Sequence, residues 1–255
     1  MSEPRILLYD IETSHNLAAI FSMYDELTQH ENILQERYVI SVSWKWLDSP
    51  KVHSVSVLDD PKLFKKDPNN DLHVLKTFCK VLLEADCIVG HNSDSFDLRM
   101  LEGRALYHGL SPLPPITSID TLKVAKKRFR FNCNRLDYIG QFLGLGKKIK
   151  TSNELWLRVL RGDRAAIKAM VAYNKQDVLL LEKVFLKLRP YMENHLSRGL
   201  FGKTGCPRCG SHSVQSRGTH KAVTRTYQRF QCQKCGGWFR SLRNESSYPQ
   251  EFRII

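Results

Sequence analysis

Two acidic residues stand two positions apart near the start of the chain. Asp10 and Glu12 follow an apolar run, residues 5–9, which has the composition of a buried strand. Because side chains i and i+2 of a strand point to the same face, the two carboxylates project together from the strand end. Carboxylates this close repel each other unless a cation lies between them. The pair predicts a divalent-metal site, although Asp-x-Glu alone is a common motif.

A second polar cluster, HNSDSFD at residues 91–97, lies where a short apolar strand passes into a helix. Strand ends of an α/β sheet are where binding sites gather. We expect Asp94 to cap the helix, since Asp is a preferred N-cap residue. Asp97 lies too far into the helix to cap it, so it has the stronger claim to a metal. His91 is expected to make structural hydrogen bonds.

The third stretch is YNKQD, in a helix predicted over residues 164–188 and ended by Pro190. Tyr173 and Asp177 are four residues apart and therefore share a face of this helix. A tyrosine at helical spacing is usually a packing residue, so this pair has chemical meaning only together with the other acids.

Four cysteines near the C-terminus form two tight pairs, CPRC and CQKC. Zn²⁺ favours four thiolates in a tetrahedron, and a two-residue spacer lets both sulfurs of a pair reach one ion. Four protein ligands leave no open coordination position, so the predicted zinc site is structural. The remaining cysteines are scattered, which suits reduced thiols rather than a disulfide framework. The predicted ligands are Cys206, Cys209, Cys232 and Cys235.

The basic charge of the chain is concentrated in its C-terminal part. The net charge is +13, and residues 196–255 hold eleven Lys and Arg against two Glu, or +9. Interleaved basic and aromatic side chains there suit contact with phosphates and stacking on bases. A solvated basic face or a protein-docking module is the alternative interpretation. The residues expected to contact nucleic acid are Arg225, Arg229, Lys234, Trp238, Phe239 and Arg240.

Strands mixed with helices predict an α/β domain with a mixed sheet that positions the acids. A composition change after His195 predicts two domains, residues 1–195 and a linker with a four-cysteine ribbon over 196–255. Residues 17–37 are expected to be partly helical, and 38–47 with 51–58 to form an antiparallel hairpin. Further predicted elements are helices over 72–83, 121–128 and 135–143, a helix within residues 91–109 that Gly109 ends, and a strand over 87–90.

The three acidic stretches together resemble the DEDD exonucleases of the DnaQ-like, ribonuclease H-like superfamily, in the tyrosine subclass. The resemblance rests on Asp-x-Glu in the first strand, on Asn-x₃-Phe-Asp beginning at Asn92, and on the Tyr-x₃-Asp motif, and it extends over residues 4–189. The chain is similar to stand-alone phage and bacterial exonucleases related to family-B polymerase proofreading domains. The histidine subclass has a histidine where this chain has Ala172, so that subclass does not fit.

This resemblance implies a ribonuclease H-like, five-stranded mixed sheet flanked by helices and a two-metal reaction. Asp10, Glu12 and Asp177 would hold one Mg²⁺ or Mn²⁺, and Asp10 with Asp97 a second. Tyr173 would orient the attacking water, and the product would be a 5′-mononucleotide released from a 3′ end. Weaker candidates are Asn92 and Phe96 for the terminal nucleotide, Lys147 or Lys148 for phosphate, and Asp120 as a support or a local cap.

The expected substrate is DNA, either a single strand or a primer 3′ end, in replication proofreading or repair. The ribbon would grip this DNA or a separate DNA polymerase or replication protein. Two alternatives stay open: an RNA 3′-end exoribonuclease of the same fold, and a non-catalytic protein that binds nucleic acid or a partner. Lacking a long apolar run and a secretion signal, the sequence predicts a cytoplasmic protein without membrane contact, in the host cytoplasm if phage-encoded.

Overall fold

The computed structural model describes residues 4–20, 28–47, 49–113, 115–192, 205–221 and 226–240. It divides into two compact units, Arg5–Phe185 and a C-terminal unit of Leu186–Ile255 together with Met1–Pro4. The domain boundary predicted at His195 lies outside the described residues and stays a prediction.

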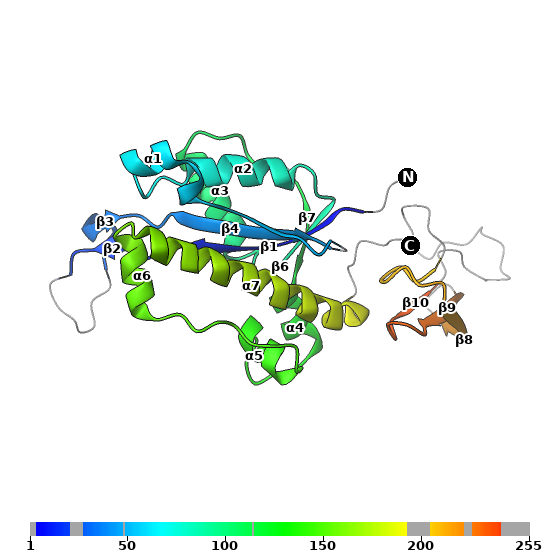
Figure 1. Ribbon diagram of the computed structural model, residues 1–255. Coiled ribbons are helices and arrows are strands. Elements are labelled where there is room, and N and C mark those ends of the chain that lie inside the picture. Colours follow the sequence, from blue (N-terminus) through cyan, green and yellow to red (C-terminus); the bar gives the residue numbers. More distant parts are fainter. Residues whose placement is uncertain are drawn as a thin grey trace. The chain divides into compact units, whose positions relative to one another are not determined.

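The larger unit is built on a mixed five-stranded sheet, as predicted (Figure 1). The strand order is β5 (Val52–Ser56), β4 (Val39–Trp46), β1 (Ile6–Thr13), β6 (Cys87–Gly90) and β7 (Thr117–Asp120). β1, β4 and β5 pair antiparallel, whereas β6 runs parallel to both β1 and β7. The predicted hairpin is therefore β4 and β5, and β1 is the central strand.

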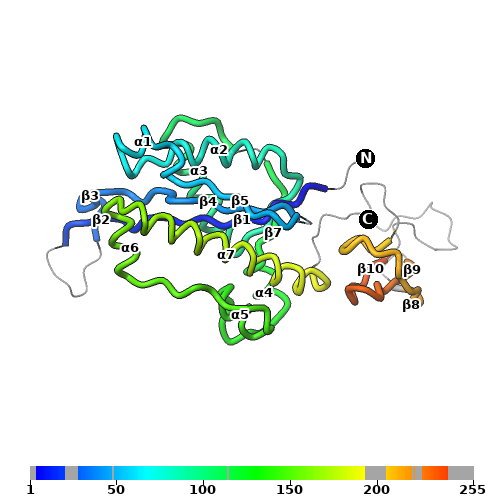
Figure 2. Tube along the Cα trace, viewed as in Figure 1, coloured from blue at the N-terminus to red at the C-terminus, as the bar shows by residue number. Residues whose placement is uncertain are grey.

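Helices cover both faces of this sheet, and Figure 2 follows the chain between them. In the view of Figure 1, α2 and α3 lie above the sheet and α6 and α7 below it. The helices are α1 (Pro61–Lys66), α2 (Leu72–Leu82), α3 (Asp97–Tyr107), α4 (Thr121–Arg128), α5 (Leu136–Phe142), α6 (Asn153–Leu160) and α7 (Arg164–Leu188). No helix among the described residues has the length and apolarity needed to cross a membrane.

Side chains of strand β1 alternate between the two faces of the sheet. Its odd-numbered residues pack into the core, where the Tyr9 ring lies 5.4 Å from that of Phe78 on α2. The even-numbered Asp10 and Glu12 point to the opposite face, toward α7. On the neighbouring strand β4, small buried serines such as Ser41 stand opposite them and leave room for α7 to approach.

Helix α5 packs closely on α7 at a glycine. A Cβ atom at Gly140 would come within 2.8 Å of Leu180 Cδ1 and 2.9 Å of the Gly146 carbonyl oxygen. Only glycine fits this approach, which holds the loop after α5 against α7. The backbone N–H of Lys148 in this loop donates to Asp137 at 2.7 Å, so the position of Lys148 is fixed.

The partly helical structure predicted for residues 17–37 is wrong for the part that is described. Two short antiparallel strands, β2 (Leu17–Ala18) and β3 (Ile33–Gln35), pair there, and a 3₁₀ turn, His30–Asn32, precedes β3. Leu17 and Leu34 are exposed, so the apolar residues do not form a buried helical stripe. Strand pairing satisfies the backbone groups instead. Residues 21–27 lie outside the described part.

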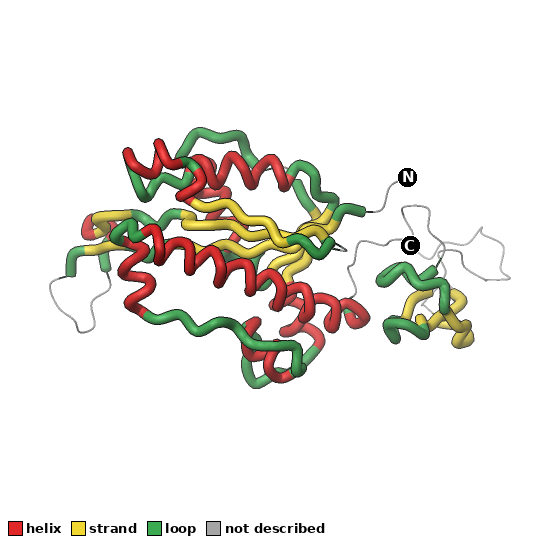
Figure 3. The backbone as a smooth tube through the Cα atoms, viewed as in Figure 1, coloured by secondary structure: helices red, strands yellow, loops and turns green. Residues whose placement is uncertain are grey.

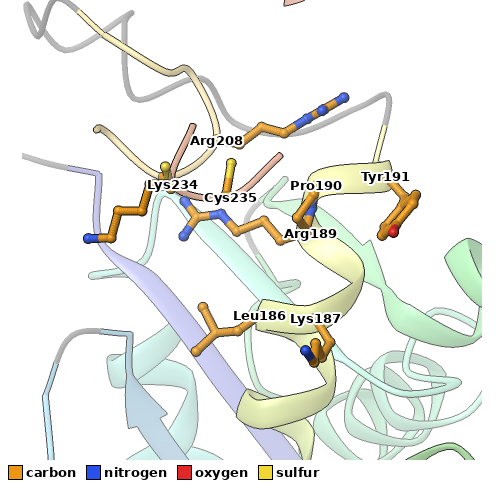
Figure 4. A pocket seen from close by; sticks show the side chains of 9 residues that line it. Leu186, Lys187, Arg189, Pro190, Tyr191, Arg208, Lys234 and Cys235 are labelled. Carbon is orange, nitrogen blue, oxygen red and sulfur yellow. The ribbon is translucent and has the colours of Figure 1, made fainter. Parts of the chain in front are cut away.

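The C-terminal unit contains a three-stranded antiparallel sheet (Figure 3). Its order is β10 (Trp238–Arg240), β9 (Thr226–Cys232) and β8 (Val214–Lys221). The unit also has a pocket of about 400 Å³ with a basic lining (Figure 4). The pocket is lined by Leu186, Lys187, Arg189, Pro190, Tyr191, Arg208, Cys209, Lys234 and Cys235.

Candidate active site and metal centres

Carboxylates from three remote stretches of the chain meet beside β1. Oxygens of Asp10, Glu12 and Asp177 all lie within 4.8 Å of one another. Asp97, the first residue of α3, accepts a hydrogen bond from the backbone N–H of Ile11 at 3.3 Å. This bond brings Asp97 to the strand between the first two acids. The fold therefore gathers the four acids that the sequence singled out.

The gathered acids resist ionisation. Burial raises the pKa of Asp10 and of Glu12 well above the usual range, and repulsion by Asp97 and Asp10 respectively adds to it. Burial also raises the pKa of Asp97 to about 7. It raises the pKa of Asp177 too, against the opposing attraction of Lys148. A divalent cation would displace these protons, so its binding should strengthen as the pH rises.

One lysine reaches into this cluster. Lys148 Nζ lies 2.5 Å from Asp177 Oδ2 and 3.4 Å from the Tyr173 hydroxyl. Burial alone would lower the pKa of Lys148, but Asp10 and Asp177 raise it overall. The ammonium group is thus an internal counter-ion for the acids. Lys147, the other lysine predicted to bind phosphate, is exposed.

The donor set fits a hard divalent cation. Mg²⁺ and Mn²⁺ prefer carboxylate oxygens as ligands. This site offers such oxygens from Asp10, Glu12 and Asp177, close enough together to bind one ion. Among the described residues, Asp177 Oδ1 is buried and has no hydrogen-bond partner. A buried carboxylate oxygen without a partner is costly, so a cation ligand is its natural complement.

The exit of β6 is stabilised by hydrogen bonds rather than by metal ligands. His91 bonds Thr121 Oγ1 and the Asn134 carbonyl oxygen, each at 2.9 Å, in agreement with its expected structural role. Asp120 accepts from the backbone N–H of Leu122 at 2.9 Å and caps α4, and it also accepts from the N–H of Asn92. Asp120 is therefore the local cap that the sequence allowed.

The expectation that Asp94 caps α3 is wrong. Its carboxylate accepts from Ser118 Oγ at 2.5 Å and from Lys123 Nζ at 2.7 Å. Phe96 is the N-cap residue of α3 and makes no side-chain cap. The turn after β6 directs Asp94 toward β7 and α4, where a hydroxyl and an ammonium group compete successfully with the helix N–H groups.

The two predicted nucleotide contacts lie at the rim of the cluster. Asn92 adopts a left-handed conformation, with φ of 67°, and its side-chain Oδ1 accepts from Ser95 Oγ at 2.6 Å. Phe96 is 36% exposed, and the guanidinium of Arg37 lies 5.7 Å from its ring centroid. Both side chains are accessible enough to meet a ligand, and their contact with a nucleotide stays a prediction.

Sequence reasoning missed Asn174. Its side-chain Nδ2 donates to Asp10 Oδ2 at 2.7 Å, and its Oδ1 accepts from Ser41 Oγ at 3.3 Å. Asn174 and Ser41 are fully buried, so this chain of bonds fixes the orientation of Asp10. The signal was present in the sequence, because Asn174 lies three residues before Asp177 and hence on the core-facing side of the helix.

We expect Asn174→Ala to weaken Mn²⁺ binding by about 10- to 100-fold, because groups that orient metal ligands typically contribute that much. The affinity can be measured by isothermal titration with Mn²⁺. Ser41→Ala should have a smaller effect, since Asn174 would keep its bond to Asp10. Equal affinity in wild type and Asn174→Ala would show that Asp10 needs no such support.

The four cysteines of the C-terminal unit form a second candidate metal centre. Their sulfurs all lie within 4.8 Å of one another, with Cys206 and Cys235 3.8 Å apart and Cys209 and Cys232 3.6 Å apart. Zn–S bonds of about 2.3 Å in a tetrahedron place sulfurs about 3.8 Å apart. Burial raises the pKa of Cys232, but N–H groups of neighbouring residues outweigh it and bring the pKa to about 7. The geometry and chemistry fit Zn²⁺.

The small sheet presents basic and aromatic side chains on one face. Arg229 and Arg240 are cross-strand partners, and Trp238 shares their face of β10. The Arg229 guanidinium lies 5.1 Å from the Trp238 ring centroid, and Trp238 is 45% exposed. Arg225, also predicted to contact nucleic acid, lies outside the described residues.

Comparison with known proteins agrees with the fold of the larger unit. The family model of the RNase H superfamily matches residues 47–189. Among solved structures, the chain is similar to the family B DNA polymerase from the hyperthermophilic archaeon Pyrobaculum calidifontis, with a TM-score of 0.55 and 18% sequence identity. The similarity covers 74% of this chain but 25% of the polymerase chain, so this chain spans about a quarter of its length. No curated protein sequence matches the chain.

Proposed function

The chain belongs to the RNase H superfamily, and on that premise we propose that it is a metal-dependent exonuclease that removes 5′-mononucleotides from DNA 3′ ends. The observation that carries this proposal is the convergence of Asp10, Glu12 and Asp177 within 4.8 Å, with Asp97 hydrogen-bonded to the strand between the first two. Two details of the proposal, cleavage from the 3′ end and DNA as the substrate, rest on the resemblance of the three acidic motifs to those of the DEDD exonucleases.

The four acids have distinct roles in this proposal. Asp10, Glu12 and Asp177 would hold one Mg²⁺ or Mn²⁺, and Asp10 with Asp97 would hold a second. When bound, such ions would supply activation of a water for attack on the phosphodiester and stabilisation of the leaving 3′-oxygen. Asn174 keeps Asp10 oriented through its 2.7 Å hydrogen bond.

Tyr173 acts by orienting the attacking water. Burial raises the pKa of Tyr173, so the hydroxyl keeps its proton at neutral pH and donates a hydrogen bond rather than taking a proton. Lys148, whose ammonium group lies near both Tyr173 and Asp177, offsets the charge of the scissile phosphate. Asn92 and Phe96 bind the terminal nucleotide, and Lys147 contributes a further phosphate contact.

A gel assay tests the proposal. Single-stranded DNA, single-stranded RNA and a primed DNA duplex, each labelled at the 5′ end, are incubated with the full chain and Mg²⁺ or Mn²⁺. We expect a ladder of labelled DNA shortened from the 3′ end, and no shortening in EDTA. Shortening of RNA with intact DNA would favour the exoribonuclease alternative. Binding without shortening under both metals would favour the non-catalytic one.

We further propose that the C-terminal unit is a zinc ribbon that recruits the catalytic unit to its substrate or to a replication partner. Its cysteine cluster would hold one structural Zn²⁺. The shared face of Arg229, Trp238 and Arg240 would then contact DNA phosphates and bases. Proofreading for a separate polymerase and DNA repair are both consistent with such a role.

A further inference from the structure

A second basic surface lies on the larger unit, around α4 and α5. Residues 121–136 contain six Lys and Arg and no Asp or Glu. All six are exposed, namely Lys123, Lys126, Lys127, Arg128, Arg130 and Arg135. Lys123 is paired with Asp94, but the surface as a whole carries a strong positive charge. Such a concentration of charge attracts a polyanion.

Aromatic rings stand among these basic side chains. Phe129 stacks on Phe131 with ring centroids 5.2 Å apart, and Phe131 meets Phe142 edge-on at 5.4 Å. Tyr138 stacks on Phe142 at 6.1 Å. Phe142 is 63% exposed and lies together with Phe131 and Tyr138, so it offers an accessible ring face within an aromatic cluster.

Two adjoining pockets connect these rings with the acid cluster. The first, of about 500 Å³, is lined by Asn92 and Lys148 and by Lys126 of α4. The second, also about 500 Å³, is lined by Tyr138 and Phe142. The two pockets share Arg135 and Asp137, so together they make one hollow. Figure 1 shows α4 and α5, whose residues line the hollow, next to each other.

We propose that this hollow, from Asn92 and Lys148 to Tyr138 and Phe142, is the track that holds single-stranded DNA behind its 3′ end. The inference rests on the proposed function and adds where the strand runs. Lys126 and Arg135 neutralise backbone phosphates, and Tyr138 and Phe142 stack on unpaired bases. A single strand fits better than a duplex, because stacking on these rings requires bases whose faces are free.

Binding to a labelled oligonucleotide tests the track without any cleavage. A 5′-fluorescein single-stranded DNA of about ten nucleotides, a length within the usual site size of such proteins, is titrated with the full, zinc-loaded chain in a buffer without Mg²⁺ or Mn²⁺ and without a chelator, so that the C-terminal unit keeps its zinc. Anisotropy then reports the affinity. Phe142→Ala should weaken binding at least about fivefold, since stacking of one base contributes about 1–3 kcal/mol. A plot of the logarithm of the binding constant against the logarithm of the salt concentration has a negative slope, and Arg135→Ala should reduce the magnitude of this slope by about 0.7.

Lys65→Ala is the matched control, since Lys65 is an exposed lysine on α1, far along the chain from the track. It should leave affinity and salt dependence unchanged. If Phe142→Ala and Arg135→Ala bind as tightly as Lys65→Ala does, the track is overturned. Melting temperatures of the variants show that a loss of binding does not come from unfolding.

A small substrate separates failure of the track from failure of the proposed function. The p-nitrophenyl ester of thymidine 5′-monophosphate occupies only the scissile position. Track variants should hydrolyse it at the wild-type rate while showing a raised KM for oligonucleotides. If the wild type cleaves nothing but Phe142→Ala still weakens binding, the track stands and the exonuclease proposal falls. If the variants lose activity on the small substrate too, these residues belong to the reaction site and the track is wrong.

Discussion

Asp10→Asn is expected to lower the rate of 3′-end cleavage by roughly three orders of magnitude or more. Asp10 is the acid assigned to both metal ions, and it lies within 4.8 Å of Glu12 and Asp177. Charge stabilisation by such ions amounts to several kcal/mol, and each 1.4 kcal/mol is about a factor of ten in rate. Single-turnover cleavage of 5′-labelled DNA at saturating Mg²⁺ measures the effect on chemistry apart from substrate binding.

Asp94→Asn is the matched control for this substitution. Asp94 belongs to the same polar cluster at the end of β6, but its carboxylate is bound by Ser118 and Lys123 and is not among the clustered acids. The control should keep its rate within a few-fold of wild type. Equal losses in the two variants, or an active Asp10→Asn, would contradict the assigned metal ligands.

Thermal unfolding shows whether Asp10→Asn acts on the metal or on the fold. Burial raises the folded-state pKa of Asp10 well above 3.8. The stability that protonated Asp10 contributes at low pH is therefore lost as the pH rises from 3.8 through the higher folded value. At pH 8 without metal, the neutral asparagine variant should thus unfold at the wild-type temperature or above it. Added Mn²⁺ should raise the melting temperature of the wild type far more than that of the variant.

Loss of zinc is expected to unfold the C-terminal sheet and leave the larger unit folded. Structural Zn²⁺ sites typically contribute about 10–16 kcal/mol of binding free energy, which in small domains is the folding free energy. In residues 205–221 and 226–240, the buried apolar side chains are those of Cys206 and Cys232, so the described part of the sheet has little apolar core. The double variant Cys206→Ser, Cys232→Ser should contain no zinc. Limited proteolysis should then remove its C-terminal part rapidly.

Cys79→Ser controls for this experiment, because Cys79 lies on α2 and outside the cysteine cluster. It should retain one equivalent of zinc and resist the protease. The double variant should still hydrolyse the p-nitrophenyl nucleotide ester, while its oligonucleotide affinity falls most at low salt. Zinc retained in the double variant, or a protease-resistant C-terminus without zinc, would show that the cysteines do not hold the sheet together.

The elements with the strongest patterns were predictable from the sequence. Helix α7 begins and ends where its periodicity and Pro190 placed it, and strands β4 and β5 form the hairpin that their β-branched residues indicated. The acids also meet, because alternation in β1 and spacing in α7 fix which faces carry them. These are local rules that a sequence states directly.

The sequence predictions that were wrong or undecided concern features that depend on contacts between residues remote in sequence. The apolar residues of 17–37 suggested a helix, but the described part pairs as β2 and β3. Asp94 is of a residue type that often caps helices, but its carboxylate instead accepts a hydrogen bond from Ser118, which is remote in sequence. Sequence spacing could not choose between Lys147 and its neighbour, since the loop position depends on the packing of Gly140 against α7. Helices α1 and α6 were not predicted because they have only six and eight residues, which is short for a periodic pattern to be recognised.

Strand β1 is the central strand of the sheet, and its two acids are in register with Ser43 and Ser41 of β4, beyond the stretch Ile6–Leu8 that pairs with β6. Amide protons of a central strand exchange with solvent only when a whole domain opens, unlike those of loops and edges. The geometry of Asp10 and Glu12 therefore depends on the pairing of β1 with β4, which extends to Thr13. Local fraying at either end of the chain leaves these two ligands in register, so the capacity to bind metal should persist until the larger unit unfolds cooperatively.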